Sequence, residues 1–184
     1  MKKLLLILAL LSSAFAAESG SYIGVGVGYA SVEAESLTGQ SGNSDGVSGA
    51  FALGYKYNDY GRIYAVGMYK DASNGYESLN SLSAAYDFMV PLHERLSLYL
   101  GLVVGYSNYA GNDIEDGAAN YGAEAGAVLS LTDTIEVEVG YRYLREDANE
   151  ITQDITLYTA KNSQVVTLDF NFYFDSEKYF TYGN

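Results

Sequence analysis

The sequence contains no cysteine, a single proline and few basic residues. Without cysteine, the stability of the protein does not rest on disulfide bonds, even if the protein is exported. Lysine and arginine number 10 against 23 aspartate and glutamate residues, so the net charge is −13. This charge excludes nucleic acid as a partner, because binding to phosphates needs a positive surface. The apolar run Leu4 to Leu11 is shorter than the roughly 20 residues of a membrane-spanning helix.

Residues 1–16 are typical of a secretory signal peptide. Lys2 and Lys3 precede the apolar run, and Ala14 and Ala16 follow it in the A-x-A spacing of a cleavage site. We therefore expect export, with cleavage after Ala16. The loss of Lys2 and Lys3 leaves 8 basic residues against 23 acidic ones, a net charge of −15. The mature chain is long enough for one domain, which we expect at residues 17–174, with a short tail at 175–184.

The segment Gln164–Phe174, QVVTLDFNFYF, alternates between two kinds of side chain. One face would carry Val166, Leu168, Phe170, Phe172 and Phe174, and the other Val165, Thr167, Asp169, Asn171 and Tyr173. A repeat of two residues is that of a β-strand. An apolar face that suits hydrocarbon and a polar face that suits a lumen are typical of a strand in an outer-membrane barrel.

Seven further segments alternate in a similar way: Tyr22–Ala30, Val47–Tyr57, Arg62–Lys70, Ser78–Val90, Leu96–Asn108, Asn120–Ser130 and Ile135–Arg145. Each has about the 9 to 11 residues that cross a bilayer as a tilted strand, and the total is even. Short turns alternate with longer loops, which include residues 34–46 and 146–163. We expect the turns on the periplasmic side and the loops outside. The alternation is least regular in the third segment, where we expect Tyr64, Val66 and Met68 to face lipid.

Composition indicates which face points outward. In a soluble, lipocalin-like barrel the apolar face would point inward, and the outer face would consist mainly of Gly, Ala and Ser, with little charge for solubility. In a membrane barrel the small and charged residues fill the lumen, and tyrosines gather near the strand ends as an interfacial girdle. The signal peptide favours the membrane barrel.

The stretches LSLYLGLVVGYSNY, IEVEVGYRYL and VVTLDFNFYF resemble the small OmpA- and OmpX-type outer-membrane barrels. The resemblance implies an all-β fold, an eight-stranded antiparallel up-and-down barrel in the bacterial outer membrane. It also implies a non-enzymatic protein with a structural or adhesive role, whose outer loops contact a surface ligand or host protein. A narrow porin-like channel for small solutes or ions is the alternative. Two features differ from the family pattern: the chain continues beyond Phe174, and the aromatic girdle lacks tryptophan.

The expected lumen face carries several charged side chains: Lys56, Asp87, Glu124, Glu136, Glu138, Arg142 and Asp169. We interpret them as interior salt bridges that fill a narrow barrel. Catalysis would need a nucleophile paired with a base, and the single histidine, His93, falls in an expected turn without a suitable serine. The acidic loops match no EF-hand spacing, and the glycines of Gly24–Gly28 alternate within a strand rather than form a dinucleotide loop. No metal and no cofactor is expected.

One lumen pair can be predicted in detail. In an antiparallel hairpin, a three-residue turn at Thr132–Thr134 would place Leu131 opposite Ile135. The same register places Glu124 opposite Arg142, within reach of a salt bridge. We expect this pair to plug the barrel near the middle of the membrane.

Two further sets of residues are assigned to contacts with the membrane and its machinery. By the alternation of their strands, Lys70 and Arg145 would point toward lipid, at the ends of the strands nearest the loops. We therefore expect them to bind lipopolysaccharide phosphates. The alternative is that they only keep the loop edge soluble. The aromatic residues of the closing strand, Phe170, Phe172 and Phe174, are expected to form the signal for the outer-membrane assembly machinery.

Overall fold

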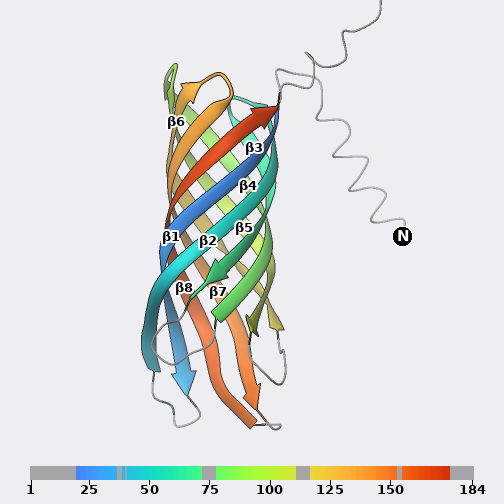
Figure 1. Cartoon of the computed structure of the whole chain (residues 1–184), viewed down its shortest axis with the longest axis vertical. Helices are drawn as coiled ribbons and strands as arrows, with labels where there is room; N and C mark the ends of the chain where they lie inside the picture. The colour runs from blue at the N-terminus through green and yellow to red at the C-terminus, as the bar shows by residue number, and fades with distance from the viewer. Residues whose placement is uncertain are drawn as a thin grey trace, which may run out of the picture.

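The computed structural model is a closed antiparallel barrel of eight strands. Their bounds are β1 (Gly20–Ser36), β2 (Ser41–Asn58), β3 (Gly61–Lys70), β4 (Ser78–His93), β5 (Leu96–Ala110), β6 (Gly117–Thr132), β7 (Ile135–Thr152) and β8 (Ile155–Phe174). Each strand pairs with its neighbours in sequence, and β8 pairs with β1 to close the sheet (Figure 1). The predicted eight-stranded up-and-down barrel is confirmed.

The structure describes residues 20–36, 39, 41–71, 78–110, 117–152 and 155–174. The predicted signal peptide, residues 1–16, and the predicted tail, residues 175–184, lie outside these ranges. Within the described ranges, no helix is long and apolar enough to cross a membrane.

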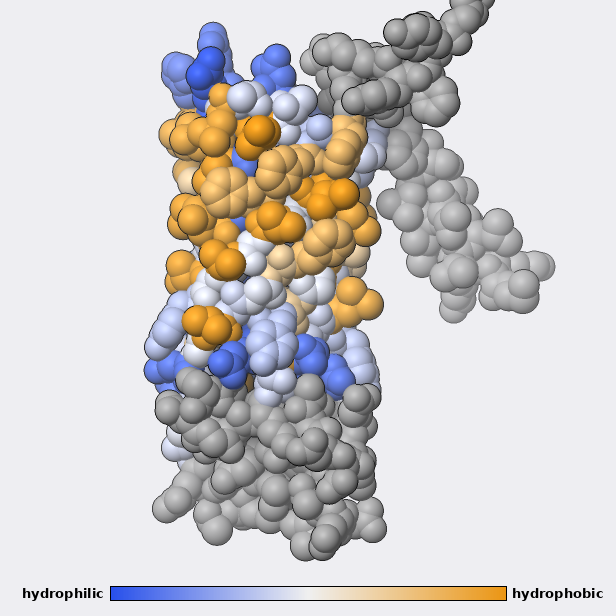
Figure 2. All heavy atoms as spheres, in the orientation of Figure 1, coloured by the Kyte–Doolittle hydropathy of each residue, from blue (hydrophilic) through white to orange (hydrophobic). Residues whose placement is uncertain are grey.

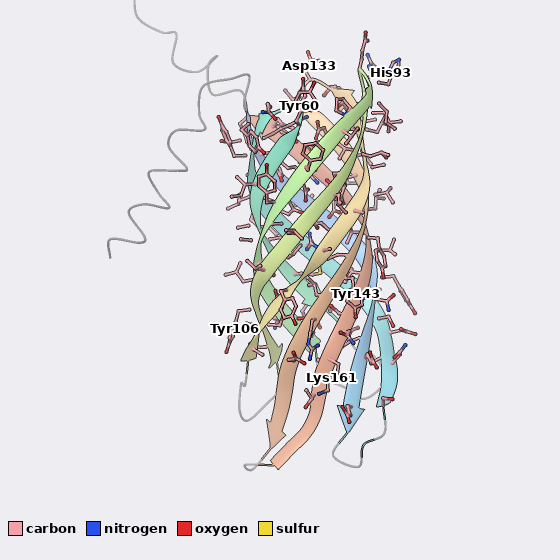
Figure 3. All side chains as sticks on the ribbon, turned by 180° about the vertical axis from the view of Figure 1, so that it is seen from behind. Tyr60, His93, Tyr106, Asp133, Tyr143 and Lys161 are labelled. Atoms are coloured by element: carbon pink, nitrogen blue, oxygen red, sulfur yellow. The ribbon has the colours of Figure 1, made fainter. Side chains whose placement is uncertain are left out.

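The outer surface of the barrel carries a broad apolar belt (Figure 2). Large aliphatic side chains of β4 and β5 are among the most exposed: Leu82, Leu100 and Leu102 each expose about two thirds of their surface, at 68%, 65% and 69%. Burial would stabilise such side chains by about 1.5–3 kcal/mol each in water, so their exposure together implies a hydrocarbon surrounding. The belt ends toward the turns Asp59–Tyr60, Glu94–Arg95 and Asp133–Thr134, and Figure 3 places Tyr60, His93 and Asp133 together at that end.

The strand β3 faces the opposite way from the sequence prediction. Tyr64, Val66 and Met68, which were expected to face lipid, are buried inside the barrel. The cause is a β-bulge: Asn58 pairs with Gly61 across the turn, but the next pair is Lys56 with Arg62. The bulge leaves one extra residue, Tyr57, and reverses the parity of the whole following strand. The lumen side of β2 is lined there by small residues, which leaves room for the large side chains of β3.

The long polar segments are strands rather than loops. Residues 34–46 were predicted as a loop, but β1 and β2 remain paired as far as Glu35 and Ser41. Residues 146–163 were also predicted as a loop, but β7 and β8 remain paired as far as Thr152 and Ile155. The polar composition of these segments led to the loop prediction. Paired strands beyond the bilayer have no lipid face, so their sequences need no alternation of apolar residues. His93, expected in a turn, is the last residue of β4, and Pro91 also lies in this strand.

Candidate functional site: the charged lumen

The lumen holds ion pairs in three layers along the barrel axis. In the layer nearest the turns, Lys56 Nζ of β2 lies 2.9 Å from Glu136 Oε1 of β7. The Tyr173 hydroxyl donates to the other oxygen of this carboxylate at 2.6 Å. The ammonium group also lies 5.7 Å from the centre of the Tyr173 ring, a cation–π distance. Lys56 and Glu136 therefore face the lumen, as the alternation predicts.

The central layer is built around Arg62, a residue that the sequence analysis did not select. Its guanidinium donates to Asp87 Oδ2 at 2.7 Å and to Glu138 Oε2 at 2.6 Å. It lies 4.8 Å from the Tyr99 ring and 5.3 Å from the Tyr64 ring. Arg62 is 1% exposed, so the aromatic rings and carboxylates replace water around the charge. With the correct parity for β3, the alternation would have placed Arg62 in the lumen.

Glu124 and Arg142 also meet in the central layer. The two residues are direct cross-strand partners of β6 and β7, as the sequence predicts. Arg142 donates to Glu124 Oε2 from Nε at 2.8 Å and from Nη2 at 2.6 Å. The turn differs from the prediction, because Thr132 pairs with Ile135 and Leu131 is the extra residue of a bulge. A two-residue turn with one bulged residue leaves the same register beyond it as the expected three-residue turn.

Tyr64 connects Arg142 and Glu124 to the opposite wall of the barrel. Its hydroxyl donates to Glu124 Oε1 at 2.5 Å and accepts from Arg142 Nη2 at 3.1 Å. The ring packs among the buried side chains Tyr22, Val66 and Val103. The hydrogen bonds therefore run from β3 across the lumen to β6 and β7.

The layer nearest the loops contains Lys70, and this placement corrects the prediction of a lipopolysaccharide contact. The side chain is fully buried and forms an ion pair with Glu146 of β7. It also donates to Ser163 Oγ at 2.9 Å. Ser163 and Ser107 both donate to the Glu146 carboxylate, the former at 2.5 Å. Lys70 points inward because the bulge at Tyr57 sets the parity of all of β3, and Glu146 was missed because its segment was assigned to a loop.

Arg145, the other residue predicted at the rim, does point outward. Its side chain is 53% exposed and lies 2.7 Å from Asp147 Oδ2. Its cross-strand partner on β6 is Tyr121, which is also exposed. Figure 3 shows Tyr106 and Tyr143 on the barrel wall toward this end. Arg145 is therefore placed beside the outer tyrosines, and its contact with lipopolysaccharide stays a prediction.

Asp169 lies opposite Glu138 on neighbouring strands, so two carboxylates face the lumen side by side. It lines a cavity of about 30 Å³ together with Arg142 and Asn171. This volume holds one or two water molecules. Arg142 lines the same cavity, but its hydrogen bonds go to Glu124 and Tyr64.

Phe170, Phe172 and Phe174 lie on the lipid face of β8, each 39–49% exposed. Their position follows the predicted alternation, and their role in assembly stays a prediction.

His93 is exposed at the turn end of the barrel. Among the described residues, no group of three or more His, Asp or Glu side chains is arranged to hold a metal ion.

Comparison with known proteins agrees with this architecture. A family model described as the outer membrane protein beta-barrel domain matches residues 3–174. A search of curated proteins found no match.

Among solved structures, Neisserial surface protein A (NspA) aligns with a TM-score of 0.64 and 17% identity, covering 84% of this chain and 97% of that one. A designed transmembrane β-barrel aligns with a TM-score of 0.51 and 14% identity, covering 84% and 95%. The outer membrane protein AlkL aligns with a TM-score of 0.50 and 13% identity, covering 87% and 92%. At these identities the likeness concerns the fold. With the family match, the apolar belt and the charged lumen, the chain belongs to the outer membrane protein beta-barrel family and is an integral protein of the outer membrane.

Proposed function

We propose that this protein is a non-enzymatic barrel with a closed lumen, which anchors and displays its long outer strands at the cell surface in a structural or adhesive role. The observation that carries the proposal is a set of ion pairs that cross the lumen. Lys56 of β2, and Arg62 and Lys70 of β3, each contact a carboxylate of β7, which is not a neighbouring strand. Side chains that meet across the lumen at three heights leave little continuous water.

Burial supports the closed lumen over the porin-like alternative. The charged groups of the central and loop-side layers are at most 11% exposed. An eight-stranded barrel has an interior just wide enough for its own side chains. A pore would need charged groups that line a water column instead of bonding to one another. The cavity of about 30 Å³ beside Asp169 holds a water molecule or two, which is far from a channel.

Single-channel recording tests the closed lumen. The mature protein in planar bilayers is expected to show no reproducible conductance. The double variant Arg62→Ser and Arg142→Ser removes the two central guanidinium groups and should admit intermittent ion flow, provided that it still folds. A large, steady conductance of the unmutated protein would overturn the proposal and favour the channel.

The outer strands beyond the apolar belt are the proposed contact surface. Exposed polar side chains there include Glu33, Glu35 and Lys161, and Asn162 donates to Glu33 at 2.8 Å. Loops and hairpins held by a rigid scaffold commonly carry such contacts. We propose that lipopolysaccharide head groups and a surface ligand or host protein meet this end of the barrel.

Thiol labelling tests which end of the barrel is displayed, because the chain has no cysteine of its own. The variants Asn162→Cys and Asp133→Cys each place one thiol at one end of the barrel: Asp133 is exposed, and Asn162 is partly exposed beside Lys161, which Figure 3 shows toward the opposite end. A membrane-impermeant thiol reagent should label the first on intact cells, and the second only after the outer membrane is permeabilised. Labelling of Asp133→Cys on intact cells, with Asn162→Cys protected, would contradict the proposed orientation.

A further inference from the structure

The central layer contains more carboxylates than bases. Arg62 and Arg142 face three buried carboxyl groups, those of Asp87, Glu124 and Glu138. Arg142 bonds to Glu124, and Arg62 bonds to both of the others. Two guanidinium charges thus oppose three carboxyl groups in a space that excludes most water. An uncompensated buried charge is costly, so the layer is stable only if one carboxyl group is neutral or pairs with something further.

The backbone brings two of these carboxyl groups together. Asp87 of β4 and Glu124 of β6 are both cross-strand partners of Gly101 on β5. Because Gly101 has no side chain, both carboxyl groups lean over it. A Cβ atom at position 101 would lie 1.9 Å from Asp87 Oδ1 and 3.0 Å from Glu124 Cγ. The carboxyl groups of Asp87 and Glu124 are therefore neighbours over the same glycine.

The hydrogen bonds around this pair identify one unsatisfied atom. Asp87 Oδ2 accepts from Arg62, but Oδ1 has no hydrogen-bond partner among the described residues, and Asp87 is 0% exposed. Both oxygens of Glu124 already accept, one from Tyr64 and one from Arg142. An ionised carboxylate only accepts hydrogen bonds, whereas a protonated one also donates. A proton on Asp87 Oδ1 would therefore satisfy that atom by donation to Glu124.

We propose that Asp87 and Glu124 form a proton-binding site in which Asp87 carries the proton and donates it to the Glu124 carboxylate. Glu124 and Glu138 then remain ionised opposite Arg142 and Arg62, and Asp169, the cross-strand partner of Glu138, is the remaining carboxyl group beside these residues. Two carboxylates in direct contact cannot both stay ionised, and a shared proton is the general solution. The charged and titratable groups around Asp87 and its neighbours Arg62 and Glu124 come from six other strands: Tyr22 on β1, Arg62 and Tyr64 on β3, Tyr99 on β5, Glu124 on β6, Glu138 and Arg142 on β7, and Asp169 on β8.

Infrared spectroscopy of the folded barrel in lipid at neutral pH tests the site. A protonated carboxyl group has a C=O stretching band that carboxylates lack. The wild-type protein should show the band, and Asp87→Asn should lose it. Asp169→Asn is the matched control, because Asp169 is another lumen carboxyl group that forms no ion pair among the described residues, and the band should persist there. Absence of the band in the wild type, or its loss in Asp169→Asn with retention in Asp87→Asn, overturns the proposal.

Stability provides an independent measure. The amide of Asp87→Asn can accept from Arg62 and donate to Glu124, as the protonated acid is proposed to do. Its urea midpoint at neutral pH should equal that of the wild type, whereas Glu138→Gln should lower the midpoint. An equal loss in Asp87→Asn and Glu138→Gln would overturn the proposal. If Asp87→Asn does not fold, Glu124→Gln decides instead: without the neighbouring carboxylate, Asp87 can ionise opposite Arg62, so the carboxyl band should be lost. An unchanged band counts against the site.

Discussion

Arg145 and Glu146 are neighbours on β7, yet their ion pairs lie in different surroundings. Arg145 points outward, and its bond to Asp147 is about half exposed. Glu146 points inward, and its bond to Lys70 is completely buried. The exposed pair forms where water and salt already stabilise each charge, so it adds little. The buried pair has no such alternative, so each partner depends on the other and on the serines around it. The contribution of an ion pair to the stability of this barrel therefore depends on whether its side chains face the lumen or the outer surface.

The largest effect is expected from removing one member of the buried pair. Lys70→Met should lower the free energy of unfolding by roughly 3–5 kcal/mol, because Glu146 is left charged and unpaired. The double variant Lys70→Met and Glu146→Leu should recover most of the loss, since apolar pairs of similar volume replace buried ion pairs well. Urea unfolding of the barrel in detergent measures both. The single variant Glu146→Leu completes the cycle: if its loss and that of Lys70→Met simply add in the double variant, Lys70 and Glu146 do not depend on each other.

A smaller effect is expected for Glu124 and Arg142, whose surroundings supply other partners. A double-mutant cycle with Glu124→Gln and Arg142→Gln should give a coupling energy of about 1–3 kcal/mol. Tyr64 can still bond to whichever group remains, which limits the loss. The same unfolding assay measures the coupling. Additive changes in the cycle would show that the observed contacts contribute no mutual stabilisation.

The smallest effect on stability is expected at the exposed pair. Charge reversal in Arg145→Glu should leave the urea midpoint of the barrel unchanged within error. The same variant should retain less lipopolysaccharide on purification, because a base beside the outer tyrosines is replaced by an acid. Lys161→Glu is the control, since Lys161 is another exposed base at the same end of the barrel, paired with Glu35. Equal retention of lipopolysaccharide in Arg145→Glu and the wild type would contradict the proposed contact.

The pairing of Glu124 with Arg142 could be predicted because it depends on one local hairpin. The sum of paired residue numbers stays constant along such a ladder, and both segments alternate regularly. Arg62 and Lys70 could not be placed in the same way. The bulge at Tyr57 adds one residue to β2 without a sequence signal, and β3 contains tyrosines on both faces that obscure its parity. Glu146 was missed because it follows the last residue of the predicted segment Ile135–Arg145, where a polar stretch was assigned to a loop.

The sequence by itself determined the number of strands, the fold class and the apolar face of seven of the eight strands, because these properties depend on the two-residue repeat of each segment. Only the tertiary structure decided which charges meet across the lumen. Examples are Arg62 with Glu138, Lys70 with Glu146, and Asp87 beside Glu124. The position of each of these residues along the barrel axis depends on strand tilt, bulges and barrel closure. Those quantities accumulate around the whole sheet, so no single segment carries them.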